Sequence, residues 1–151
     1  MEFDFALVTQ CLPLLIKGAG LTLQITALAV GIGLILGLIL GMAQLSRHWI
    51  LHMPAKIYVD FIRGTPLLIQ IFIIYFALPN ILGTRIDPFV AAVTACSMNS
   101  GAYIAEIFRG GIQCIPSDQY EAVQVLGMTK SQIFFKVTLL QVIKRVIPPM
   151  G

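Results

Sequence analysis

Charged side chains are scarce in this sequence. Asp, Glu, Lys and Arg make up 11% of the 151 residues, whereas an ordinary soluble domain carries about 25%. Hydrophobic residues make up 58%, and the mean hydropathy is +0.89. The few charges are also unevenly spread, because none occurs within residues 18–46, 64–84 or 88–105. This distribution argues against a soluble globular domain and predicts an integral membrane protein.

Catalytic motifs are also missing. The sequence has no G-x-x-x-x-G-K-[ST] phosphate loop, so this chain should not bind or hydrolyse ATP itself, and it has neither H-E-x-x-H nor G-x-S-x-G. Cys11, Cys96 and Cys114 stand far apart, which argues against a disulfide or a metal site. His48 and His52 have a spacing that can bind a metal, but no third ligand is nearby. We expect no enzymatic activity, no cofactor and no metal.

The three charge-free stretches predict three membrane-spanning helices. A helix needs roughly 20 apolar residues to cross a bilayer; the first two stretches meet this, and the third does so once the turn ending at residue 109 is added. Because lipid offers no hydrogen bonds to the backbone, these spans should be α-helices. We therefore expect an all-α membrane protein with an outer N-terminal segment, 1–17, and spans near 21–44, 64–79 and 88–109.

The Lys and Arg residues predict the orientation. If the N-terminus lies outside, only Lys17 and Arg85 of the ten Lys and Arg residues are on the outer side. Cytoplasmic loops carry such an excess of positive charge, so the polar loop around Glu121 should lie in the cytoplasm. The net charge of +3 is then explained by the excess of Lys and Arg in the cytoplasmic loops, and it implies no nucleic-acid partner. Glu2 and Asp4 stand where a secretory signal would be positively charged, so the first span should stay in the mature protein.

Local signals predict helix packing and helix ends. Gly33, Gly37 and Gly41 recur at steps of four, a spacing that lets membrane helices approach closely. Gly64-Thr65-Pro66 predicts a break, with Pro66 suited to the first turn of the second helix. Asp87-Pro88 predicts an N-cap followed by Pro at the first position of the third helix.

The loop at 110–136 has readable local signals of its own. Pro116-Ser117-Asp118 predicts the start of a short helix, which Gly127 can end in the left-handed conformation. Thr129 can cap the next helix, with Gln132 at the third helical position. Two helices separated by a sharp turn at Gly127 are therefore expected.

Three segments resemble a known family. They read FIRGTPLLIQIFIIYFALP at 61–79, NSGAYIAEIFRGGI at 99–112, and Glu-Ala-Val at 121–123 followed by Gly127. They resemble the permease subunits of ATP-driven (ABC) importers for polar amino acids, of the glutamine/histidine type, whose loop carries Glu-Ala-Ala and then a Gly. The Val of the Glu-Ala-Val run departs from that pattern, as does Val-Thr-Leu-Leu at 137–140, where the family has Ile-x-Leu-Pro.

The resemblance implies a fold and a function. The chain would be an ABC type-1 importer transmembrane domain, 18–151, in the bacterial inner membrane, translocating a polar amino acid delivered by an external binding protein. A second permease subunit and a cytoplasmic ABC ATPase dimer would be its partners, together with membrane lipid. Glu121, Ala122 and Gly127 would couple the permease to the ATPase.

Members of that family have a fourth and a fifth span. The stretch 137–151 is expected to be the start of a fourth span, so the chain resembles a permease truncated at its C-terminus and should not transport alone. Two alternatives stay open: a secondary transporter or channel fragment, which the lack of an acidic residue at the centre of any span weakens, and a non-transporting membrane scaffold.

Polar side chains within the predicted spans are the candidates for a substrate pathway: Gln70, Asn99, Ser100 and Tyr103. Asn99, Tyr103 and Glu106 fall at steps of four and three, hence on one helical face. Intramembrane polar groups usually face a bundle interior or a cavity; the alternative is hydrogen bonding between helices, worth about 0.6 kcal/mol per pair. Glu106 is also spaced to form a structural ion pair with Arg109.

Overall fold

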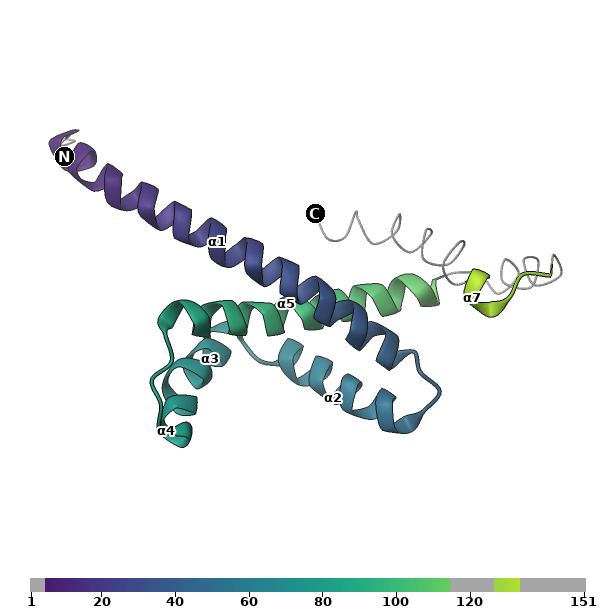
Figure 1. Cartoon of the computed structure of the whole chain (residues 1–151). Helices are drawn as coiled ribbons and strands as arrows, with labels where there is room; N and C mark the ends of the chain where they lie inside the picture. The colour runs from purple at the N-terminus through teal and green to yellow at the C-terminus, as the bar shows by residue number, and fades with distance from the viewer. Residues whose placement is uncertain (1–4, 115–126, 134–151) are drawn as a thin grey trace.

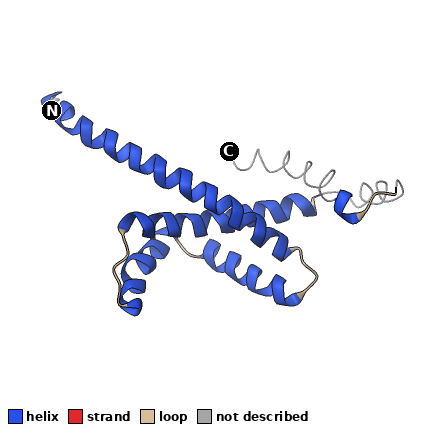
Figure 2. Cartoon of the chain, viewed as in Figure 1, coloured by secondary structure: helices blue, strands red, loops and turns tan. Residues whose placement is uncertain are grey.

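The computed structural model describes residues 5–114 and 127–133. All regular structure within these residues is helical, and they contain no strand (Figure 2). The elements are α1 (Phe5–Gln44), α2 (Trp49–Gly64), α3 (Leu67–Phe72), η1 (Ile73–Ala77), α4 (Leu78–Leu82), α5 (Pro88–Gln113) and α7 (Lys130–Ile133). In Figure 1 the long α1 crosses α5, α2 folds back beside them, and α3 and α4 lie near the start of α5. The expected all-α class is confirmed.

α1 is longer than the sequence predicted. It begins at Phe5, not near Leu21, and runs as a single helix of 40 residues. Pro13 lies inside it and removes one backbone hydrogen bond, but the sequence on both sides is strongly apolar, and membrane helices tolerate an internal Pro. Most of the segment expected to precede the first span is therefore part of the same helix.

The glycine stripe of α1 packs against α5, as predicted. An ideal Cβ built on Gly33 would lie 2.6 Å from the Ser100 Cβ, and one on Gly37 would lie 2.6 Å from the Ile104 Cβ. A Cβ on Gly41 would lie 2.9 Å from Cδ1 of Phe108. No larger residue fits at these positions without moving a helix, so the three glycines set the close crossing of α1 and α5.

α2 completes the small buried core. Val59 and Ile62 of α2 pack against Ala102 and Ala105 of α5, and all four side chains are buried. The Tyr58 hydroxyl donates a hydrogen bond of 3.3 Å to the backbone carbonyl of Met98. Small residues on α5 and branched residues on α2 thus bring the two helices together.

The second predicted span begins at a bend. The sequence predicted a break at Gly64-Thr65-Pro66 ahead of that span, and α2 and the segment Leu67–Leu82 meet there at 106°. Pro66 lies just outside α3 as its N-cap, with an extended ψ of 136°, because Pro cannot continue the α2 hydrogen-bond ladder. Thr65, which precedes it, is also extended, as residues before Pro usually are.

Past the bend, the helix contains a π-helical turn, η1, and continues to Leu82, beyond the predicted end of the second span at residue 79. Pro79 is tolerated there because it lies in the first turn of α4. Gly83, in the left-handed conformation with φ 69°, terminates α4.

The start of α5 follows the predicted rule. Asp87 is the N-cap, and its carboxylate accepts hydrogen bonds from the backbone N–H groups of Phe89 (2.9 Å) and Val90 (3.3 Å). Pro88 occupies the first turn. The helix runs to Gln113, beyond the predicted end of the third span at residue 109.

Among the described residues, one helix is by itself long and apolar enough to cross a membrane, Cys11–Gln44. The bent pair Trp49–Gly64 and Leu67–Leu82 adds a second if its halves form one span. α5 has 26 residues, which at 1.5 Å per residue exceeds a hydrocarbon core roughly 30 Å thick. Its polar residues, including Ser97, Asn99 and Ser100, lower its hydropathy.

Candidate functional site

The polar residues predicted on α5 separate into two environments. Asn99 is partly exposed and Tyr103 is 47% exposed, so both are accessible from outside the small core. Ser100 instead lies at the crossing with α1, directly opposite Gly33. The structure therefore keeps Asn99 and Tyr103 together on an accessible face and puts Ser100 into helix packing.

Gln70 holds the bend between α2 and α3. It is 7% exposed, and its side-chain nitrogen donates to the Ile62 carbonyl (2.8 Å), the Thr65 carbonyl (3.1 Å) and the Thr65 hydroxyl (2.9 Å). The last carbonyls of a helix have no partner within the helix, and Gln70 supplies one at the end of α2. These bonds account for the burial of Nε2, whereas the buried Oε1 has no hydrogen-bond partner among the described residues.

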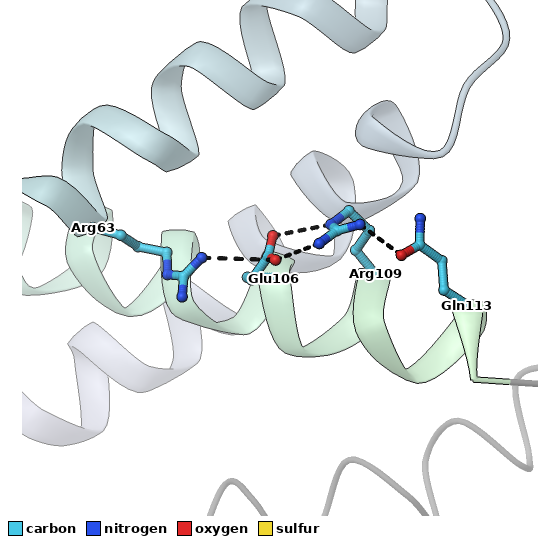
Figure 3. Close-up of polar contacts among 4 residues, drawn as sticks. All are labelled: Arg63, Glu106, Arg109 and Gln113. Carbon is cyan, nitrogen blue, oxygen red and sulfur yellow. Dashed lines mark hydrogen bonds and ion pairs between the residues drawn. The ribbon is translucent and has the colours of Figure 1, made fainter.

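Glu106 lies between two arginines (Figure 3). Arg109 donates to it twice, from Nε to Oε2 at 3.0 Å and from Nη2 to Oε1 at 2.5 Å. Arg63 of α2 approaches the same Oε1, with its Nη1 at 3.7 Å. Arg109 also donates from Nη1 to Oε1 of Gln113 at 2.7 Å. The predicted ion pair is therefore present, and it extends to α2.

Arg63 also reaches Tyr103. The guanidinium carbon lies 5.5 Å from the centre of the Tyr103 ring, within the range of a cation–π contact. Arg63 thus joins the accessible face of α5 to the Glu106 carboxylate. Its role was not predicted from the sequence, because the contact depends on how α2 folds back against α5.

Next to this network is a polar cleft of about 150 Å³. α2 contributes His52, Lys56 and Asp60, which follow one another at steps of four. α5 contributes Glu106, Arg109 and Gln113. The remaining lining residue is Gln44, at the end of α1. The only signal in the sequence was the four-residue spacing of the α2 residues, which predicts one helical face but not what the face meets.

Two contacts shape the cleft at the end of α1. Nδ1 of His52 lies 2.6 Å from the Gln44 backbone carbonyl. A carbonyl can only accept, so this nitrogen carries a proton and Nε2 is the ring's other, uncommitted nitrogen. The Gln44 side chain is 6% exposed, and its buried Nε2 has no hydrogen-bond partner among the described residues. His52 thus donates to a backbone carbonyl at the end of α1.

The comparisons identify the family. Residues 33–151 match the family described as "Binding-protein-dependent transport system inner membrane component". The chain belongs to this family. It is 42% identical to the glutamine transport system permease protein GlnP of Escherichia coli (strain K12), over all of the chain and 69% of that protein. It is 39% identical to the arginine transport system permease protein ArtQ of Bacillus subtilis (strain 168), over 98% of the chain and 68% of ArtQ.

Two solved structures share the fold. One, described as an amino acid ABC transporter with histidines, has a TM-score of 0.91 at 40% identity, over 100% of this chain and 70% of that one. The other is an inward-facing MetNI methionine ABC transporter, with a TM-score of 0.70 at 24% identity, over 91% of this chain and 68% of that one; it supports the fold alone. The ABC type-1 importer fold expected from the resemblance is confirmed.

The family defines the role of the chain. It is a permease subunit of an ABC importer, an inner-membrane component that works with ATPase and binding-protein subunits. The permease is not an enzyme, because a separate subunit hydrolyses ATP.

The loop after α5 is described only at its end. Gly127 has φ 76°, so the predicted left-handed turn is confirmed. Thr129 and Gln132 form the predicted reciprocal cap of α7, with Thr129 N donating to Gln132 Oε1 (3.0 Å) and Gln132 N donating to Thr129 Oγ1 (3.4 Å). Glu121 and Ala122 lie outside the described residues, as does the short helix expected before Gly127.

Proposed function

We propose that this permease translocates a polar amino acid along the accessible polar face of α5. The observation that carries the proposal is the alignment of Asn99 and Tyr103 on that face, with Arg63 stacked on Tyr103 and paired with Glu106. Polar and charged groups in a membrane helix are costly and usually serve a path or a partner. The relatives named for glutamine and arginine transport support the substrate class.

The assembly follows from the same proposal. A second permease subunit, identical or homologous, would enclose the pathway with this one, and an external binding protein would deliver the amino acid. Two cytoplasmic ATPases would dock on the loop that carries Glu121, Ala122 and Gly127. ATP binding would then shift the permease pair between inward-facing and outward-facing states, a two-state equilibrium biased by ligands.

ATP-driven uptake by the complex in proteoliposomes tests the proposal. Asn99→Leu and Tyr103→Leu should each lower uptake of radiolabelled glutamine, arginine or histidine at least several-fold, because a polar contact to the substrate is lost. Thr94→Val is the matched control, since the Thr94 hydroxyl bonds only the carbonyl one turn earlier on α5 and is exposed. Normal uptake in both Leu variants would reject this face as the pathway. Uptake that needs no ATP would favour a secondary transporter or channel instead.

A further inference from the structure

We propose that the polar cleft between α2 and α5 is a second binding site for the transported amino acid, which recognises its α-ammonium and α-carboxylate groups. The inference rests on the proposed function for the identity of the ligand. During transport, the amino acid would bind in the cleft after it leaves the α5 face of Asn99 and Tyr103. It would then be released on the side where α1 ends.

Gln44 is the first reason to infer a ligand. Its side chain is almost fully buried, and its Nε2 has no hydrogen-bond partner among the described residues, although it lines a polar cleft. Buried donors in folded proteins are nearly always paired, and an unpaired one calls for an explanation. A ligand oxygen in the cleft would pair it.

The charges in the cleft indicate what kind of ligand fits. The Glu106 carboxylate is already shared by Arg109 and Arg63. Lys56 and Asp60 lie one turn apart on α2, and among the described residues neither makes an ion pair within 4 Å. Each acts on the network only at longer range, Lys56 on Glu106 and Asp60 on Arg109. The cleft therefore offers one cation and one carboxylate that no close ion pair holds. A simple anion would face Asp60 and a simple cation would face Lys56, whereas a zwitterion can satisfy both.

His52 supports the same assignment. Its Nδ1 proton is committed to the Gln44 carbonyl, which leaves Nε2 available to a ligand. Beside it, Gln44 Nε2 and the Lys56 ammonium are donors that can bind a carboxylate. Asp60 would then receive the ammonium group.

Size and position agree with binding of the α-ammonium and α-carboxylate end of an amino acid. A cavity of about 150 Å³ accommodates a molecule of the size of benzene, and the cleft has a volume of about 150 Å³. Glu106 belongs both to the cleft and to the α5 face that carries Asn99 and Tyr103, and Arg63 contacts both Tyr103 and Glu106. An amino acid leaving the pathway face would therefore reach the cleft after passing Arg63.

The two histidines of the chain make a direct test possible. In the variant His48→Asn, His52 is the only histidine, and ¹⁵N-labelled His52 reports on the cleft by NMR with the full chain in phosphatidylcholine nanodiscs. Glutamine, arginine and histidine are each titrated. Glutaramic acid, which is glutamine without its α-amino group, and 4-aminobutanamide, which is glutamine without its α-carboxylate, are the matched ligand controls.

We expect a saturable shift of the His52 resonance with all three amino acids. Each control ligand should bind about tenfold more weakly, because it leaves one charge in the cleft unpaired. Lys56→Met and Asp60→Asn should weaken amino-acid binding by about the same factor. Lys17→Met, at an exposed position in the first half of α1, should leave binding unchanged. The ligand-free spectrum of each variant shows whether the cleft is still folded, and Asp60→Asn keeps the shape of the side chain.

Several outcomes would overturn the inference. They are the absence of a saturable shift with any amino acid, equal binding of the control ligands, and unchanged binding in both α2 variants. If glycerophosphoethanolamine or inorganic phosphate binds as tightly as glutamine, the cleft is a headgroup or phosphate site. ATP-driven uptake with no shift rejects the cleft alone, whereas a shift without ATP-driven uptake rejects the proposed function and keeps the binding site.

Discussion

Gly37 shows how little space separates α1 from α5. An added Cβ would lie 2.6 Å from the Ile104 Cβ and 2.9 Å from the Gly101 carbonyl oxygen. Gly37→Ala must therefore displace a helix, and we expect a loss of about 1–3 kcal/mol in the free energy of unfolding. Gly31→Ala is the control, because nothing lies within 4 Å of the position of its added Cβ. Thermal unfolding in detergent measures both, and equal losses would contradict the packing role.

A substitution of Gln70 can distinguish a role in helix structure from a role in substrate binding. Gln70→Leu keeps the side-chain volume but removes the donor to the Ile62 and Thr65 carbonyls. The Thr65 carbonyl would lose this donor and the Ile62 carbonyl would keep only the Thr65 hydroxyl, at 3.3 Å, which should cost about 1–3 kcal/mol of stability. The exposed Gln24 of α1 supplies the control, Gln24→Leu, for which we expect no measurable loss. A Gln70→Leu protein that keeps full stability but loses substrate affinity would instead support the pathway role first expected for Gln70.

At the scale of single elements, helix ends were predictable because their signals are local. Asp87 and Pro88 cap α5, and Thr129 and Gln132 cap α7, through atoms no more than three residues apart. The break between α2 and α3 was also predicted, from Gly64-Thr65-Pro66. Its angle was not, because Gln70 reaches back eight residues to the Ile62 carbonyl across the bend.

The two candidate sites also differ in whether the local sequence is enough to predict them. The face of Asn99 and Tyr103 follows from helical spacing alone. The cleft required the fold, since His52 and Lys56 on α2 approach Glu106 only after the chain turns back at the end of α1 and α2 packs on α5. No spacing within one helix could have identified those partners.

Gly127 makes the turn before α7, in the loop proposed to couple the permease to the ATPase. Its φ of 76° is a conformation that β-branched residues rarely adopt. Gly127→Val should therefore distort the turn before α7 and reduce co-purification of the ATPase, while the protein still inserts into the membrane. Gly127→Asn is the control, because Asn tolerates this conformation and should retain most of the ATPase. Equal retention by the two variants would remove the turn from the coupling mechanism.

The whole molecule is polarised along the direction of α1. The cleft and the charged ends of α2 and α5 gather where α1 ends, whereas the α4–α5 connection, which holds Arg85, lies at the start of α5 (Figure 1). Of the Lys and Arg residues that the structure describes, Arg47, Lys56 and Arg109 therefore lie toward this end, and Arg85 lies at the other. Because such an excess marks the cytoplasmic side, this end should face the cytoplasm and the N-terminus should lie outside.

Cysteine labelling can test this orientation on intact cells. With the native cysteines Cys11, Cys96 and Cys114 replaced by Ser, a new cysteine at Thr84 should react with a membrane-impermeant maleimide, because that exposed position would face the periplasm. A cysteine at His48, exposed at the start of α2, should react only after the membrane is permeabilised. The reverse pattern would invert the protein and put the cleft on the side where substrate arrives. In that case, a zwitterion bound between α2 and α5 would be an amino acid received from the binding protein, not one about to be released.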